Sequence, residues 1–496
     1  MCGIVAVHDP TGPDSALGER MLDRIGHRGP DGRGTRTVGP TWLGHARLSI
    51  VDLDHGAQPL PSDDGHWAVV NGEIYNHARL REVAPRDFRT DSDSEAALSA
   101  AISDDPDALG DLRGMYAFAV AHVDGDLVVA RDPVGVKPLY WVRTGPATLF
   151  ASEMRAFDAV HRPLVESFPP GHRWSPTTGL ARFRELHVGG REIKDRDLAL
   201  RLLRTTLETA VHRRMMADVP LGVFLSGGLD SSLVAALMAR HADEVGGTVH
   251  SFAAGTAGSS DVVAARRVAE HLGLEHHERL YDADEVLAVL PDVVRSIESY
   301  EPSLVRSAVP NYLLAQETAR TVKVVLTGEG ADELFAGYSH HRDVAEADLR
   351  QELLDSVSGL HNLNLQRCDR VTMAHGLEAR VPFLDRDVVD LAARLPISWR
   401  VPHRHGLEKA LLREAFAGWL PDDVLWRPKE QFGEGSGTAE VMARRVADLV
   451  PDPDWAGERV AGLPAPRSRE ELAYQRMFAE GLAGVPAALL GRFADA

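Results

Sequence analysis

The chain has 496 residues, too many for one ordinary domain, so we expect two or three hydrophobic cores. Its hydrophobic fraction of 44% and charged fraction of 26% are typical of globular proteins. The net charge of -19 argues against a nucleic-acid-binding protein, because phosphate backbones are bound by clustered Lys and Arg. No apolar run approaches the roughly 18 residues of a membrane-spanning helix, and we expect no membrane partner.

The amino terminus and the cysteines predict a cytoplasmic protein. The first ten residues, MCGIVAVHDP, have neither the positive leader nor the long apolar run of a signal peptide. Only Cys2 and Cys368 are present, which supports neither a disulfide framework nor a Cys-based zinc site. The histidines form no zinc-type motif, and the adjacent pairs at 276–277 and 340–341 are more typical of surface or packing positions than of metal ligands.

Residues 1–186 have the pattern of an α+β domain built mainly from short strands. The predicted strands are apolar runs bounded by turn residues, at 3–7, 67–70, 117–120, 127–130 and 148–151. The helical spacing of Leu17, Met21 and Ile25 predicts one amphipathic helix, and residues 95–102 predict another.

Residues 187–496 have a different pattern, and the change falls near 187–191. Helices and strands alternate, at 200–215 (helix), 219–225 (strand), 231–240 (helix), 249–254 (strand), 262–272 (helix), 286–297 (helix) and 322–326 (strand). This alternation predicts a parallel sheet covered by helices on both faces. Beyond Gly330 the pattern is mainly helical.

Cys2 is a candidate nucleophile because it follows the initiator Met. If Met1 is removed, the thiol and a free α-amine belong to the same residue. An α-amine with a pKa of about 7.7–8.0 is partly neutral near physiological pH and can accept the thiol proton. Taken alone, a small residue near a terminus that happens to be Cys is the better interpretation.

Four segments that follow Cys2 favour the catalytic interpretation. They are GHRGPD (26–31), ARLSIVD (46–52), NGEIYN (71–76) and DSDSE (91–95). With Cys2 they resemble the glutamine-hydrolysing domain of class II amidotransferases, which has the N-terminal-nucleophile fold, an αββα sandwich. RDPVGVKPLY (131–140) and ASEMRA (151–156) resemble the asparagine synthetase branch of that family.

This resemblance implies roles for individual residues of the first domain. Asn71 and the Gly72 N–H would form an oxyanion hole, although an isolated Asn-Gly pair is more typical of a hairpin turn. A guanidinium fork suits a carboxylate, so Arg47 would bind the α-carboxylate of glutamine, and Glu73 and Asp93 would bind its ammonium or amide group. The implied glutamine-binding set is Arg47, Leu48, Ser49, Ile50, Val51, Asn71, Gly72, Glu73 and Asp93. Ser92 departs from the Gly usual in the family and leaves the acidic residue intact.

The segment SGGLDSS (226–232) lies between a predicted strand and a predicted helix. Glycines let a backbone approach phosphate, and a helix N-terminus offers unpaired N–H groups. The Walker pattern is absent. A purely structural turn is the alternative, but Asp230 with flanking serines is similar to the pyrophosphate loop of adenylate-forming enzymes.

Three later segments extend the asparagine synthetase resemblance: LTGEGADE (326–333), GLEARVPFLD (376–385) and RPKEQF (427–432). They imply that Glu329 promotes formation of an acyl-adenylate and that Asp230 and Asp332 hold Mg²⁺, a cation that prefers carboxylate oxygens. Arg380 and Asp385 would be architectural. The implied ATP-binding set is Leu225, Ser226, Gly227, Gly228, Asp230, Ser231, Ala254, Thr327, Gly328 and Lys429.

The acceptor carboxylate is the least determined substrate. The segment YEPSLVR (300–306) aligns with one that usually has two adjacent threonines in asparagine synthetases, and here these positions are Ser303 and Leu304. Arg306 is kept and would bind an α-carboxylate. Aspartate is the first choice, and another amino acid or a specialised-metabolite acid stays open.

The resemblance thus implies a ligase whose small-molecule partners are glutamine, ATP with Mg²⁺, and an acceptor carboxylate. Ammonia released at Cys2 would pass along a route shielded from solvent to a doubly wound α/β synthetase domain, because free ammonia is mostly protonated in water. Two alternatives stay open. The enzyme could deliver another nitrogen nucleophile, or the protein could bind nucleotide or glutamine without turnover. A β-lactam synthetase is disfavoured, because those relatives lack the cysteine. A homodimer is left open.

Overall fold

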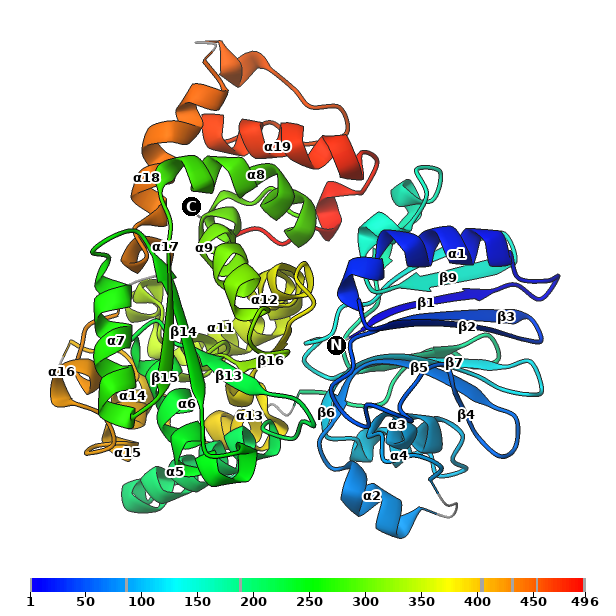
Figure 1. Ribbon diagram of the computed structural model, residues 1–496, viewed down its shortest axis with the longest axis horizontal. Coiled ribbons are helices and arrows are strands. Elements are labelled where there is room, and N and C mark those ends of the chain that lie inside the picture. Colours follow the sequence, from blue (N-terminus) through cyan, green and yellow to red (C-terminus); the bar gives the residue numbers. More distant parts are fainter. Residues whose placement is uncertain are drawn as a thin grey trace.

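The computed structural model describes residues 2–84, 88–186, 190–401, 406–429, 432–451 and 454–493. Two bodies lie side by side, one formed by the first part of the chain and one by the rest (Figure 1). Residues 187–189 of the expected domain boundary lie outside the described residues. Within the described residues, no helix combines the length and the apolar character needed to cross a membrane.

The first body contains two six-stranded antiparallel sheets. The first sheet has the strand order β10 (Glu166–Ser167), β8 (Tyr140–Thr144), β9 (Ala147–Ala151), β1 (Gly3–His8), β3 (Thr41–Arg47), β2 (Gly32–Val38). The second has the order β12 (Gly179–Arg182), β11 (His172–Ser175), β7 (Leu127–Arg131), β6 (Gly114–Ala121), β5 (Trp67–Ile74), β4 (Leu60–Pro61).

Successive side chains of a strand point to opposite faces of its sheet, and the apolar inner faces explain why these two sheets stack. Ile4 and Ala6 of β1 face Val69 of β5 and Ala117 of β6 in one buried cluster between the sheets. The outer faces are covered by helices: α1 (Ser15–Arg24) on the first sheet, and α2 (His77–Val83), α3 (Ser94–Ala101) and α4 (Ala108–Asp111) on the side of the second (Figure 1). The predicted αββα sandwich is confirmed.

The second body is built around a five-stranded parallel sheet. Its order is β15 (Glu275–Leu280), β14 (His250–Gly255), β13 (Leu221–Phe224), β16 (Val324–Leu326), β17 (Glu378–Arg380). Helices α6 (Leu229–Arg240) and α7 (Ser260–Leu272) pack on one face, and α9 (Pro302–Thr318) and α12 (Asn364–Met373) on the other. The predicted doubly wound α/β domain is confirmed.

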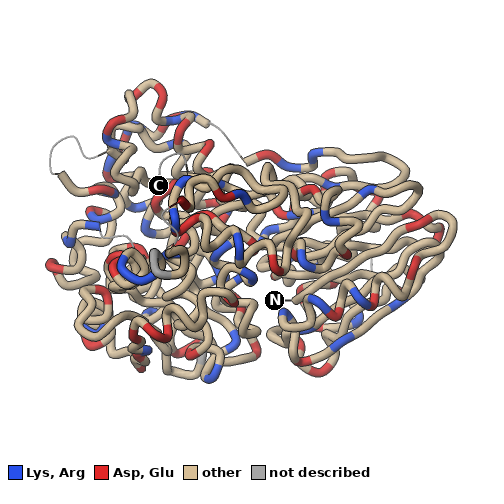
Figure 2. Tube along the Cα trace, turned by 90° about the horizontal axis from the view of Figure 1, so that it is seen from above, with Lys and Arg blue, Asp and Glu red and all other residues tan. Residues whose placement is uncertain are grey.

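Most of the remaining chain is helical, as predicted beyond Gly330. These helices are α5 (Arg196–Arg213), α8 (Ala283–Ile297), α10 (Ala331–Phe335), α11 (Glu346–Gly359), α13 (Arg386–Ala393), α14 (Ile397–Arg400), α15 (Ala410–Ala415), α16 (Asp422–Leu425), α17 (Phe432–Gly435), α18 (Thr438–Arg445) and α19 (Arg469–Leu482). Figure 2 shows Lys and Arg mixed with Asp and Glu along both bodies, so the negative net charge is not gathered in one segment.

Candidate active sites

Cys2 lies just before β1 and is held on both sides of its backbone. Its N–H donates to Asn71 Oδ1 at 3.0 Å, and its carbonyl accepts a bond from Arg28 Nε at 3.0 Å. The side chain is 7% exposed, and Sγ lies 3.9 Å from the Leu48 carbonyl oxygen. Burial raises the pKa of the Cys2 thiol, so a base has to take its proton when the sulfur attacks. Met1 lies outside the described residues, and its removal stays a prediction.

Asn71 and Gly72 lie inside strand β5, so the hairpin-turn alternative is wrong. The φ of Gly72 is +139°, and a Cβ at this position would lie 1.9 Å from the Met115 carbonyl oxygen. Glycine is therefore required sterically. Asn71 is fully buried, and its Nδ2 has no hydrogen-bond partner among the described residues. An unpaired buried donor beside a thiol is what an oxyanion hole needs.

Two buried carboxyl groups, Glu73 and Asp93, continue this site. Asp93 Oδ2 accepts the Ile74 N–H at 2.6 Å, and burial raises the pKa of Asp93 to about 6. Burial, and then the neighbouring Glu378, raise the pKa of Glu73. Arg380 of β17, in the second body, places Nη2 3.5 Å from Glu73 Oε1. The structure thus brings Arg380 to the edge of the thiol site, and the architectural role that the resemblance implies for it stays a prediction.

Arg47, at the end of β3, and the residues that follow it make contacts within the protein. Arg47 donates to the carbonyl oxygens of Leu53 (3.1 Å) and Asp52 (2.6 Å). Leu48 and Ile50 are buried in the same apolar cluster as residues of the second body, with Val51 packed against it, and the Ser49 N–H donates to Asp31. The structure thus places residues 47–51 between the thiol site and the second body. Their contact with glutamine stays a prediction.

A second site lies at the carboxyl ends of β13 and β16, where ligands usually bind to parallel sheets. A cavity of 680 Å³ opens there. It is lined by most of the residues predicted for ATP, namely Leu225, Ser226, Gly228, Asp230, Ser231, Thr327, Gly328 and Lys429. Gly227 and Ala254 do not line it. Ala253 does, while Ala254 is buried in the same cluster as Phe252 on the opposite face of β14.

The loop after β13 has the form expected of a phosphate cradle. The φ of Gly227 is +70°, and a Cβ there would lie 2.5 Å from the Cβ of Ala264. Ser231 Oγ accepts the Ser226 N–H at 3.2 Å and fixes the turn. Helix α6 starts after Gly228 without a side-chain cap, so its first N–H groups are available to an anion.

Two carboxylates and two lysines form the charged wall of this cavity. Lys409 Nζ lies 2.6 Å from Asp332 Oδ1 and also contacts Asp230, and Lys429 Nζ lies 2.5 Å from the same Asp332 oxygen. Burial opposes ionisation, but the two ammonium groups hold the pKa of Asp332 well below its usual range. Sequence reasoning missed Lys409, because an isolated Lys in a helical region has no distinguishing signal. It is 3% exposed.

Glu329 follows β16 and points into the same cavity. Its carboxylate contacts Arg367 of α12, whose other nitrogen donates to Ser307 Oγ at 2.9 Å. Burial raises the pKa of Glu329. A partly desolvated carboxylate beside one fixed cation is suited to accept or direct a proton.

The acceptor residues have an arrangement that the sequence does not show. Ser303 and Arg306 line the cavity, but Leu304 is buried in the core and does not. Arg306 makes a two-point ion pair with Glu470 of α19, with Nε 3.0 Å from Oε1, and Tyr474 donates to the same carboxylate. Glu470 therefore fixes the guanidinium that is predicted to bind the acceptor.

Helix α12 connects the two sites, and Figure 1 shows it on the side of the second body that faces the first. Its Arg367 contacts Glu329, as described above. Two residues later, Asp369 binds both terminal nitrogens of Arg28, at 2.8 and 3.1 Å, and Arg28 donates to the Cys2 carbonyl. All these groups except Glu329 are buried. The thiol site and the cavity are thus each anchored to α12 by an ion pair, Arg28 with Asp369 on one side and Glu329 with Arg367 on the other.

Both parts of the chain match family models. A glutamine amidotransferase domain model matches residues 1–170, and an asparagine synthase model matches residues 202–355 and 343–484. The chain therefore belongs to the asparagine synthase family. It combines the synthase region with a glutamine amidotransferase domain.

Curated relatives match over nearly the full length. The chain is 38% identical to a probable glutamine-hydrolysing asparagine synthetase of Schizosaccharomyces pombe, over 97% of this chain and 93% of the relative. It is 37% identical to asparagine synthetase B of Escherichia coli, over 97% and 91%. A solved glutamine phosphoribosylpyrophosphate amidotransferase from B. subtilis is 20% identical over 49% of this chain and 64% of that one, with a TM-score of 0.31, too low to support an argument.

Proposed function

We propose that the protein converts a carboxylate into an amide, most directly aspartate into asparagine, using the nitrogen of glutamine and the energy of ATP. Glutamate, AMP and pyrophosphate are the other products. The observation that carries this proposal is the pairing of a buried terminal thiol with an ATP-sized cavity through α12. The relatives that match the whole chain bear the same activity in their names.

In the first half-reaction Cys2 attacks the amide carbon of glutamine. The α-amine exposed by loss of Met1 takes the thiol proton and passes it to the departing nitrogen, which leaves as ammonia. Asn71 Nδ2 and the Gly72 N–H donate to the oxygen as it becomes negative. Water then hydrolyses the thioester by the same route and releases glutamate. Arg47, Glu73 and Asp93 hold the polar ends of the substrate.

Replacing Asn71 tests the oxyanion hole. Asn71→Asp keeps an oxygen for the Cys2 N–H but removes the amide donor, and Asn71→Ala removes both. We expect each variant to lower kcat for glutamine hydrolysis by about 10²–10³-fold, with activity from added ammonia unchanged. Steady-state glutamate release measures the first quantity and amide formation from ammonium salt the second. An Asn71→Asp variant with normal glutamine kcat would remove Asn71 from the mechanism.

In the second half-reaction an oxygen of the acceptor carboxylate attacks the α-phosphorus of ATP, and pyrophosphate leaves. The loop at 226–231 and Lys429 bind the phosphates, and Lys409 adds a second positive charge at the same wall. Glu329 promotes formation of the acyl-adenylate and then directs the proton of incoming ammonia, which attacks the acyl carbon and releases AMP. Arg367 keeps the Glu329 carboxylate in place.

Mg²⁺, the compartment, the domain limits and the oligomeric state belong to this proposal as well. Asp230 Oδ1 is buried without a hydrogen-bond partner among the described residues, which fits a hard cation; Asp230 and Asp332 would hold Mg²⁺, and the ion would offset negative charge on the phosphates. We place the protein in the cytoplasm, since both cysteines are unpaired. The functional units proposed are 1–186 and 187–496, and a homodimer stays open.

An acceptor panel tests the substrate. Pyrophosphate release should require aspartate among the proteinogenic and related acids. When glutamine or ammonia is added, AMP release should be accompanied by formation of the amide. The alternative, a different acceptor with the same mechanism, is kept because Ser303 replaces a usual threonine at the cavity wall. AMP release with another acid, and none with aspartate, would establish that alternative.

A further inference from the structure

Three metal-ligating side chains converge at the amino ends of β14 and β15, whereas the ATP cavity lies at the carboxyl ends of the strands. His250 Nδ1 lies 3.2 Å from His277 Nε2, and Glu275 Oε1 lies 3.6 Å from the first nitrogen and 3.4 Å from the second. The three potential ligand atoms all lie within 4.8 Å of one another.

The pairing of the strands brings these residues together. His250 is opposite Glu275 and Phe252 is opposite His277 in the parallel register, and side chains two residues apart share one face of a sheet. The Phe252 ring stacks on the His277 ring, with centroids 4.8 Å apart and an angle of 14° between the planes. This packing fixes the orientation of one imidazole.

The separations of the three atoms match the face of a tetrahedron. Zinc–nitrogen and zinc–oxygen bonds of about 2.0–2.2 Å place the ligand atoms of a tetrahedral site roughly 3.3–3.5 Å apart. The observed values are 3.2, 3.4 and 3.6 Å. The two imidazoles are within hydrogen-bond distance of each other. The two carboxylate distances exceed the roughly 2.7–3.2 Å of a normal N–H···O bond, so hydrogen bonding does not account for the position of the carboxylate.

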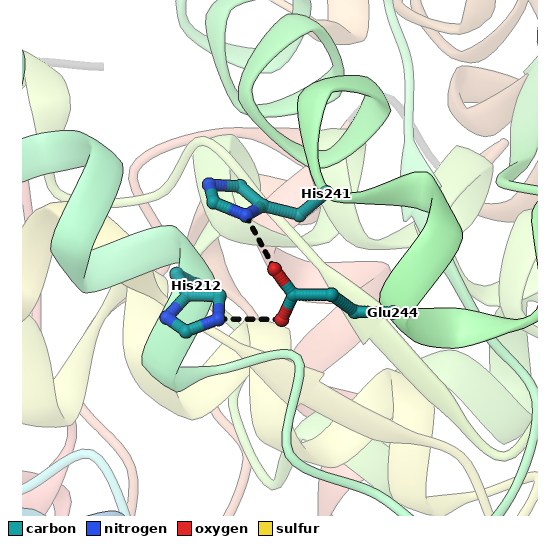
Figure 3. A group of neighbouring side chains, drawn as sticks. All are labelled: His212, His241 and Glu244. Carbon is teal, nitrogen blue, oxygen red and sulfur yellow. Dashed lines mark hydrogen bonds and ion pairs between the residues drawn. The ribbon is translucent and has the colours of Figure 1, made fainter.

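A second cluster shows the contrast. In Figure 3, His212 of α5 and His241 at the end of α6 both point to Glu244, which lies between them. Each imidazole binds its own carboxylate oxygen, at 2.6 and 2.9 Å, and these bonds lower the pKa of Glu244. Ordinary ion pairs explain that arrangement. In the β14–β15 cluster the two ring nitrogens instead face each other.

We infer that His250, Glu275 and His277 bind a divalent metal ion of the zinc type, with water as the fourth ligand. The Glu275 side chain is 54% exposed, which leaves an open side for the ion to enter. Such a site would fasten the edge strand β15 to β14, at the end of the sheet opposite the ATP cavity. Its role is structural and independent of the proposed reaction. It would make His277 of the pair at 276–277 a ligand, where sequence alone favours a surface or packing position.

The experiment titrates the chelator-treated full-length protein with Zn²⁺ against a chromophoric competitor. We expect His277→Gln to lose one equivalent of Zn²⁺, or to weaken it by more than the roughly 10–100-fold that loss of an outer hydrogen-bond partner costs at metal sites. His276→Gln is the matched control, because His276 contacts Ser251 and Glu278 instead. Zn²⁺ bound by Cys2 or by the other histidine clusters is common to all variants and cancels.

A second readout separates binding from folding. Zn²⁺ should raise the Tm of the wild type and of His276→Gln by the same amount, and that of His277→Gln by clearly less. If His277→Gln does not fold, Glu275→Gln, at an exposed position, replaces it in both measurements. Equal Zn²⁺ stoichiometry and equal affinity in the wild type, His277→Gln and Glu275→Gln would overturn the proposal, whatever the enzyme activity proves to be.

Discussion

Cys2→Ala is expected to abolish amide formation from glutamine and to leave amide formation from ammonia intact. The sulfur is the group that bonds to the substrate carbon, and no described neighbour of Cys2 offers a second nucleophile of that kind. Loss of a nucleophile in comparable hydrolases costs at least about 10⁴-fold in kcat. Glutamate release and AMP release, each measured with glutamine and then with ammonium salt, separate the two half-reactions.

The other cysteine supplies the control. Burial raises the pKa of Cys368 to about 12, so this thiol is inert, and Cys368→Ala should retain glutamine use. Equal loss of activity with both nitrogen sources in Cys2→Ala would contradict the assignment of separate tasks to the two sites.

Glu329→Gln is expected to show the opposite pattern, with normal glutamine hydrolysis and a loss of acyl-adenylate formation. Gln keeps the size of the side chain but removes the charge that faces Arg367 and the proton-accepting oxygen. Loss of one preorganised electrostatic contact at a reacting centre typically costs about 10²–10³-fold in rate, and we expect a loss of that size in acceptor-dependent pyrophosphate release.

Glu352→Gln is the matched control for this prediction. Glu352 lines the same cavity from α11 and pairs with His340 at 3.5 Å, away from Glu329. Its substitution should alter pyrophosphate release little. A Glu329→Gln enzyme that releases pyrophosphate at the wild-type rate would exclude Glu329 from the chemistry.

Sequence patterns predicted the elements that are uniformly apolar or strictly periodic. Residues 3–7 were predicted as a strand and form β1. The helical spacing of Leu17 and Met21 predicted a helix, which is α1. The glycine loop at 226–228 lies between β13 and α6, as its flanking patterns predicted. Strand β1 is buried on both faces and helix α1 on one, so burial alone determines the pattern of each element and the signal is local.

The features that were missed depend on partners distant in the chain. Strand β15 has the sequence EHHERL, which shows no apolar alternation because it is an edge strand with polar faces. The contact of Lys409 with Asp230 spans 179 positions, and the pair of Arg306 with Glu470 spans 164. Neither pairing follows from residue type or spacing, since only the folded chain brings the two charges together.

Helix α12 fixes the spacing between two residues, Arg367 and Asp369, that form ion pairs in different directions. An α-helix turns by about 100° per residue, so Arg367 and Asp369 project from it in directions about 200° apart. One reaches Glu329 and the other reaches Arg28. Deleting or inserting a single residue between positions 367 and 369 would swing one of these ion pairs out of reach and leave a buried charge unpaired, which is strongly destabilising. Surface loops tolerate such changes in length, but a change of length in this stretch would separate one of the two sites from α12.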